Sequence, residues 1–234
     1  MERHKMQRFF DEELKALNQK ILKMALLTQE SIHKSIDALK ERNAELAGKV
    51  ITDDAQIDFL ENSIDDDVFN MIALHQPVAS DLRFLMTALK VNADLERIAD
   101  LAVDIAQRVV ELVGQPLLKP LIDIPKLSAV AQKMIKDVID AYINKDVALA
   151  RQVCLSDTEA DKLRDLIQNK LINDYMAKDP KSATRAVPLL LIARYLERIC
   201  DHATNIAEDV IYMVEAKVVK HHHEKLKGEE GARE

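Results

Sequence analysis

The apolar residues of this chain follow the spacing of helices almost from end to end. They recur every three to four residues, and the pattern stops only where Pro and Gly gather. It predicts six helices, over about residues 8–43, 45–74, 80–114, 126–144, 146–178 and 182–217. The predicted breaks are a turn at residues 75–80 and a linker that contains Pro116, Pro120 and Pro125, because three prolines in so short a stretch cannot continue a helix.

The second half of the sequence repeats the first. Residues 95–106 and 196–207 are identical at 8 of 12 positions, and an offset of 103 carries Asp54 onto Asp157 and Asp58 onto Asp161. We therefore expect an all-α fold of two tandem antiparallel three-helix bundles related by an internal repeat. The predicted boundaries are residues 1–115 for the first unit, 116–125 for a Pro-rich linker, 126–217 for the second unit and 218–234 for a flexible tail.

Composition and charge favour a water-exposed helical protein and disfavour nucleic acid as a partner. Hydrophobic residues make up 48% of the chain, the formal net charge is -7, and the basic residues are scattered. The first residues lack the apolar segment of a signal peptide, and the longest apolar run, Ala186 to Ala193, is too short to span a bilayer. We expect a cytoplasmic protein without a transmembrane segment. Cys154 and Cys200 lack a CxxC spacing and are expected to be buried apolar side chains.

Acidic residues recur at a spacing of four in the second and third helix of each unit. Residues four apart lie about 40° from each other on a helix, so each series forms a stripe on one face. The third helices carry Glu96, Asp100 and Asp104 in the first unit and Glu197, Asp201 and Asn205 in the second. The second helices carry Asp54, Asp58 and Asn62, and correspondingly Asp157, Asp161 and Asp165. The apolar residues of these helices lie on other faces, so the stripes are predicted to point away from the cores.

Stripes of this kind suit metal ions. Like charges four residues apart destabilise a helix by roughly a few tenths of a kcal/mol per pair, and a bridging cation removes that repulsion. All-oxygen ligands suit magnesium, manganese, calcium or ferric iron, whereas zinc is less favoured because no His lies at a ligand spacing within the stripes. The alternative is a solvated acidic face, and the presence of two stripes in each copy favours the metal.

The segments Leu95–Asp100 and Leu196–Asp201 give the chain a resemblance to a known family. Together with the turn Gln76–Arg83 and the two-copy plan, they resemble the PhoU family of phosphate-uptake regulators. The resemblance implies a cytoplasmic, often dimeric protein that binds metal clusters on the outer face of each bundle. No enzymatic activity is expected, because the sequence has no Gly-rich phosphate loop and no context for a cysteine nucleophile. The resemblance also implies negative regulation of phosphate uptake and of the phosphate-starvation response, as an adaptor between the ATPase of a phosphate ABC transporter and a sensor histidine kinase. Association with the membrane would then be peripheral, through these partners.

The resemblance implies iron, manganese or magnesium as the cofactor and assigns metal ligands by motif. In the first unit these are Asp54, Asp58, Glu96, Asp100 and Asp104, and in the second Asp157, Asp161, Glu197, Asp201 and Asn205, with Asp165 as a further candidate. Ala99 and Cys200 stand where the family commonly has Gly, which removes no oxygen ligand. Asn205 gives the second site less negative charge than Asp104 gives the first, so unequal occupancy is expected.

Several alternatives remain open. Glu30 and His33 match the Glu-x-x-His spacing of di-metal carboxylate enzymes, and a metal-sequestering protein without a phosphate role is also possible. Arg97 and Arg198 adjoin the motif glutamates and would form surface ion pairs or contact a partner. Because the surface is acidic, phosphate itself is expected to bind only through a metal.

Overall fold

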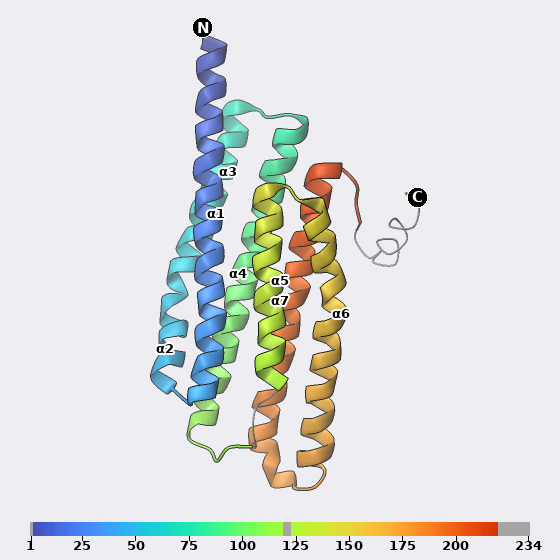
Figure 1. Cartoon of the computed structure of the whole chain (residues 1–234). Coiled ribbons are helices and arrows are strands. Elements are labelled where there is room, and N and C mark those ends of the chain that lie inside the picture. Colours follow the sequence, from blue (N-terminus) through green and yellow to red (C-terminus); the bar gives the residue numbers. More distant parts are fainter. Residues whose placement is uncertain (1, 119–122, 220–234) are drawn as a thin grey trace, which may run out of the picture.

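The computed structural model describes residues 2–118 and 123–219, and these residues form helices and loops without a strand. The helices run along one long axis, with both units side by side (Figure 1). The first unit contains α1 (Glu2–Glu41), α2 (Ala44–Asp53), α3 (Ala55–His75) and α4 (Ala79–Val113). The second contains α5 (Asp123–Asn144), α6 (Val147–Lys170), a π-helical turn η1 (Leu171–Met176), a 3-10 turn η2 (Pro180–Ser182) and α7 (Ala183–Glu215). None of these helices is both long and apolar enough to cross a bilayer.

The predicted helices are present, although several of their ends differ from the prediction and one helix is broken. The second predicted helix is broken at Asp54 into α2 and α3, so the unit has four helical pieces in the place of three helices. The fourth begins at Asp123 and includes Pro125, because a proline in the first turn of a helix replaces an N–H group that has no partner there. Most of the predicted tail, residues 220–234, and the middle of the predicted linker, residues 119–122, lie outside the described residues.

The turn after the first helix of each unit repeats in structure as well as in sequence. Arg42 and Lys145 both adopt a positive φ, of 57° and 54°. The next residues, Asn43 and Asp146, cap the following helices: each side-chain oxygen accepts a hydrogen bond of 3.0 Å from a backbone N–H three residues on. An αL residue followed by an Asn or Asp cap ends one helix and starts another within two residues. The repeat therefore extends to backbone detail.

The two units pack through α4 and α7, which form the most extensive helix contact in the molecule. The buried apolar side chains of both units belong to one continuous core. Among the described residues, two side-chain pairs cross this contact: Lys90 Nζ lies 2.8 Å from Asp209 Oδ1, and His202 Nδ1 lies 2.8 Å from Asp94 Oδ1. Paired polar groups at these positions fix the register of α4 against α7.

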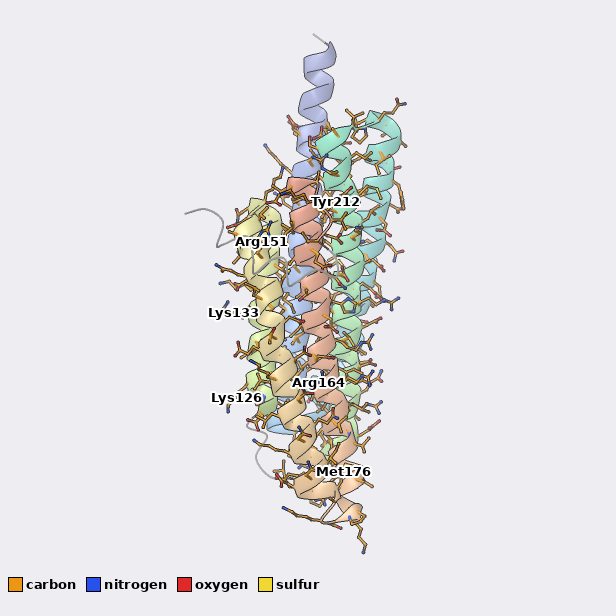
Figure 2. The ribbon with its side chains drawn as sticks, turned by 90° about the vertical axis from the view of Figure 1, so that its right-hand side faces the viewer. Lys126, Lys133, Arg151, Arg164, Met176 and Tyr212 are labelled. Carbon is orange, nitrogen blue, oxygen red and sulfur yellow. The ribbon has the colours of Figure 1, made fainter. Side chains whose placement is uncertain are left out.

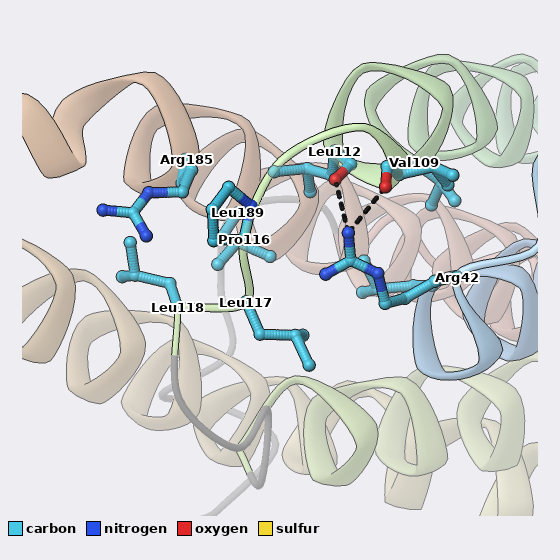
Figure 3. Close-up of a pocket in the computed structure, with 10 residues that line it drawn as sticks. Arg42, Val109, Leu112, Pro116, Leu117, Leu118, Arg185 and Leu189 are labelled. Carbon is cyan, nitrogen blue, oxygen red and sulfur yellow. Dashed lines mark hydrogen bonds between the residues drawn. The ribbon is translucent and has the colours of Figure 1, made fainter.

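Arg42 holds the end of α4 and the beginning of the linker. Its Nη2 donates to the carbonyl oxygen of Val113 at 2.6 Å and also to the carbonyls of Leu112 and Gln115. A guanidinium at this place satisfies carbonyl groups that have no partner at a helix C-terminus. Figure 3 shows this contact beside a pocket that Pro116, Leu117 and Leu118 of the linker line together with Leu189 of the second unit.

The repeated motif places Leu95 at the centre of the core, where its side chain is 0% exposed. Leu95→Ala should lower the free energy of unfolding by about 2–5 kcal/mol, because it removes packed methyl groups and leaves a cavity. Leu74→Ala is the matched control, since Leu74 is 73% exposed, and it should change stability by no more than about 0.5 kcal/mol. Urea unfolding followed by circular dichroism measures both, and equal losses would contradict the assigned core.

Candidate metal centres

The first cluster joins the α2–α3 break to the middle of α4. Asp54 forms the break, and its backbone carbonyl accepts hydrogen bonds from the N–H groups of Ile57 and Asp58, at 2.7 and 3.2 Å. Its side chain makes no capping bond, so the carboxylate stays available to other groups. Burial, reinforced by the charges of Asp58 and Asp100, raises the pKa of Asp54 to about 6. Carboxylates from α3 and α4 therefore share one electrostatic environment.

Glu96 is the most strongly affected carboxyl of this cluster. Burial and the neighbouring Asp100 raise the pKa of Glu96 to about 7, although Arg97 acts in the opposite direction. The Glu96 side chain is only 18% exposed, whereas that of Asp100 is 46% exposed. Glu96 lies outside the buried core, at the edge of the stripe that α3 covers where it packs on α4.

The second cluster repeats this arrangement between α6 and α7. Burial and Asp201 raise the pKa of Glu197, and burial together with Asp157 and Asp161 raises the pKa of Asp201. The structure thus brings together the four principal candidates of each unit. Asp104, which is partly buried, and Asn205, which is exposed, lie one helical turn farther along.

Glu61 is a member of the first cluster that the sequence stripes did not include. Burial, Asp65 and Asp58 raise the pKa of Glu61, so Glu61 belongs to the same electrostatic environment as the other carboxylates of this cluster. Asn62, which the stripe did include, donates its side-chain amide to the carbonyl of Asp58 at 2.7 Å and is exposed. The sequence spacing could have indicated this position, because Glu61 lies seven residues after Asp54. Seven residues make about two helical turns, which places both side chains on one face.

The residue that corresponds to Glu61 in the second unit is Arg164, at the same offset of 103. Its guanidinium lies 3.2 Å from Asp161, 2.9 Å from Asp165 and 3.5 Å from Glu197. In the first unit Arg97 supplies the counter-charge, at 3.0 Å from Asp100 and 3.5 Å from Glu96. The ion pair expected for Arg97 is confirmed, and arginines from different helices supply the counter-charge in the two clusters.

The donor set of both clusters fits a hard metal ion. Carboxylates that raise each other's pKa repel one another, and a cation bound by several of them removes that repulsion. Among the described residues, however, no group of three or more His, Cys, Asp and Glu side chains is already arranged to hold a metal ion. Arg97 and Arg164 lie against these carboxylates instead, so a metal would need to displace a guanidinium as the side chains turn toward it.

The residues that suggested a di-metal enzyme, Glu30 and His33, lie on α1. Glu30 pairs with Lys34 at 2.8 Å, and His33 pairs with Asp37 at 3.1 Å on the surface of α1. A di-metal carboxylate enzyme needs such side chains inside the bundle, and the outward position of this pair removes that support. Cys154 and Cys200 are buried free thiols, as predicted.

The raised pKa values predict how stability depends on pH. Between pH 5.5 and 7.5 the folded protein holds protons on Asp54 and Glu96 that the unfolded chain has lost, so the free energy of unfolding falls as pH rises. Glu96→Gln should reduce this fall and make the metal-free protein more stable than the wild type at pH 7.5. Urea unfolding in the presence of a chelator at both pH values is the measurement.

Glu45→Gln provides the control for this measurement. Lys49 lowers the pKa of the exposed Glu45, so Glu45 is ionised in both states above pH 5.5 and its replacement should leave the pH dependence unchanged. An identical pH dependence in Glu96→Gln and the wild type would contradict the assigned proton on Glu96.

Solved structures and curated relatives match the chain over most of its length. It is 42% identical over 217 residues to the phosphate-specific transport system accessory protein PhoU homolog of Aquifex aeolicus, which covers 93% of this chain and 98% of that protein. The corresponding homolog of Clostridium acetobutylicum is 34% identical over 213 residues, or 91% of this chain and 97% of that protein. The crystal structure of PhoU from Pseudomonas aeruginosa matches with a TM-score of 0.85 and 33% identity. The match covers 89% of this chain and 100% of that one.

The family comparison finds both copies of the repeat. A PhoU domain matches residues 21–109 and again residues 124–210, one match in each three-helix unit. The all-α fold of two repeated units, expected from the sequence, is therefore confirmed, and the chain belongs to the PhoU family.

Proposed function

We propose that this protein is a cytoplasmic regulator that represses phosphate uptake and the phosphate-starvation response, and that metal ions bound at its two carboxylate clusters organise it for that role. The observation that carries the proposal is the repeated pairing of carboxylates across α3–α4 and α6–α7 in a chain built of two PhoU domains. Relatives that match over more than nine-tenths of the chain are named accessory proteins of a phosphate-specific transport system. No enzymatic activity is proposed.

The metal would join helices that otherwise repel each other. In the first unit Asp54, Asp58, Glu96 and Asp100 would hold it, with Glu61 and Asp104 near, and in the second Asp157, Asp161, Glu197 and Asp201 would do so. When bound, the ion supplies positive charge and oxygen coordination that tie α3 to α4 and α6 to α7. Iron, manganese and magnesium suit this donor set. The first site has Glu61 where the second has Arg164, so the first site is more negative and should hold metal more tightly.

The partners in this role are the ATPase of a phosphate transporter and a sensor histidine kinase. The name that the relatives carry, accessory protein of a phosphate-specific transport system, supports the transporter. The kinase, a homodimeric state and peripheral association with the membrane proteins follow from the family resemblance. A metal-tied pair of helices would present a defined face to such a partner, whereas repelling helices would not.

Metal content tests the two clusters separately. Asp100→Asn and Asp201→Asn should each lower the affinity of the purified protein for manganese by at least about tenfold at the mutated cluster, because each removes a charged ligand. Equilibrium dialysis followed by elemental analysis gives the bound metal per chain. Asp140→Asn, at an exposed position on α5, is the control and should bind as the wild type does. Unchanged metal content in Asp100→Asn and Asp201→Asn would remove these residues as ligands.

Gene deletion tests the regulatory role. Cells that lack this protein should express phosphate-starvation genes in plentiful phosphate, and the wild-type gene should restore repression. Transcript levels in the two phosphate conditions are the readout. If the deleted strain keeps these genes silent, the regulatory role fails, and retained metal without a regulatory effect would then support a metal-sequestering protein.

A further inference from the structure

A groove of about 460 Å³ opens between α6 and α7, beside the second carboxylate cluster. Its polar lining consists of three arginines, one glutamine and two carboxylates: Arg164, Gln168, Arg194, Glu197, Arg198 and Asp201. Figure 2 shows Arg164 on the face where α6 and α7 lie side by side. Guanidinium groups are the side chains best suited to bind oxyanions, because their N–H groups form a planar fork.

The first unit provides a comparison within the same molecule. By the two offsets of the repeat, the corresponding residues are Glu61, Asp65, Ala93, Glu96, Arg97 and Asp100. Asn92 on α4 donates to the carbonyl of Glu61 and to Asp65, at 3.0 and 2.9 Å, so these positions face each other in the first unit as their counterparts do in the second. The first unit has one arginine and four carboxylates where the second has three arginines and two carboxylates. The net charge of these six side chains is therefore negative in the first unit and positive in the second.

The arginine of the repeated motif is Arg97 in the first unit and Arg198 in the second. Its contacts differ between the units, because Glu61 of the first unit corresponds to Arg164 in the second. In the first unit Arg97 is held by Glu96 and Asp100. In the second, Arg164 takes the counter-charge role toward Glu197, and Arg198, the counterpart of Arg97, forms no ion pair with the residues that the structure describes. Arg194 lies one helical turn before Arg198 and is exposed as well. Two like charges at this spacing repel, and an anion between them would remove that repulsion.

We propose that this groove binds inorganic phosphate directly, through Arg194 and Arg198 with Gln168 and Arg164 beside them. The acidic surface as a whole had indicated that phosphate would need a metal, and the local reversal of charge in the second unit removes that need. The proposal deepens the regulatory function proposed above by naming a ligand, and it rests on that function only for its biological meaning, since binding is measured on the purified protein.

The two carboxylates in the lining give a reason for selectivity. Phosphate near neutral pH keeps a proton on one of its oxygens, and that O–H can donate to Glu197 or Asp201 while the other oxygens accept from the arginines. Sulfate has no such proton, so its oxygens would face the carboxylates with like charge and without a hydrogen bond. A groove of arginines alone would bind the two anions with similar affinity, whereas this lining favours phosphate.

Calorimetric titration of the full chain tests the proposal. The protein is freed of metal with a chelator and titrated with inorganic phosphate at constant ionic strength, with a dissociation constant expected on the order of 1 mM for so open a site. The variant Arg194→Ala with Arg198→Ala should bind at least tenfold more weakly. Both positions are exposed on α7, and a circular dichroism spectrum checks that the variant remains folded.

The controls separate the groove from general charge effects. Arg97→Ala, at the matching position in the first unit, should leave phosphate binding unchanged, and sulfate should bind several-fold more weakly to the wild type. The proposal is overturned if the double variant binds phosphate as the wild type does, if sulfate binds equally well, or if a phosphoserine peptide binds and inorganic phosphate does not. None of these results bears on the gene-deletion test, so failure of the ligand and failure of the regulatory role are distinguishable.

Discussion

The packing of α4 against α7 is the contact on which both candidate sites depend. Each of these helices buries one face in the common core and carries a carboxylate stripe along its edge. The pairs Asp94–His202 and Lys90–Asp209 hold the two helices in register. The stripes lie on another edge of α4 and α7, beside the second helices of their own units. The result is one cluster between α3 and α4 and another between α6 and α7.

Both clusters place like charges together at partly buried positions, which opposes folding. The raised pKa values of Asp54, Glu96, Glu197 and Asp201 express that opposition, since burial and neighbouring carboxylates both disfavour ionisation. A stable core of more than fifty buried apolar side chains tolerates such a cost. Groups that are unfavourable without a ligand would gain most from a bound cation, so cation binding at these clusters would be coupled to helix packing.

The repeat has kept the turn after its first helix and its core positions, and it has changed its charges. The αL turn, the helix cap and the buried positions recur in both copies, whereas Glu61 in one corresponds to Arg164 in the other. One substitution in the second helix alters the partner of an arginine in the third, because the two side chains compete for the same carboxylates. Duplication therefore produced two sites that share a design and differ in the sign of the charge beside them.

The helices, the duplication and the spacing of the carboxylates could all be predicted from the sequence, because helical periodicity is a local property that each segment carries. The sequence also placed eight candidate ligands in the correct pairs of helices, through the offset that relates Asp54 to Asp157 and Glu96 to Glu197. The partial burial of Glu96, the place of Glu61 in the first cluster and the ion pairs of Arg164 could not be predicted in this way. These depend on which edge of one helix meets the edge of another, and a helical wheel contains no information about its neighbours. Packing across helices thus set the electrostatics of the sites, while local periodicity set the residues available to build them.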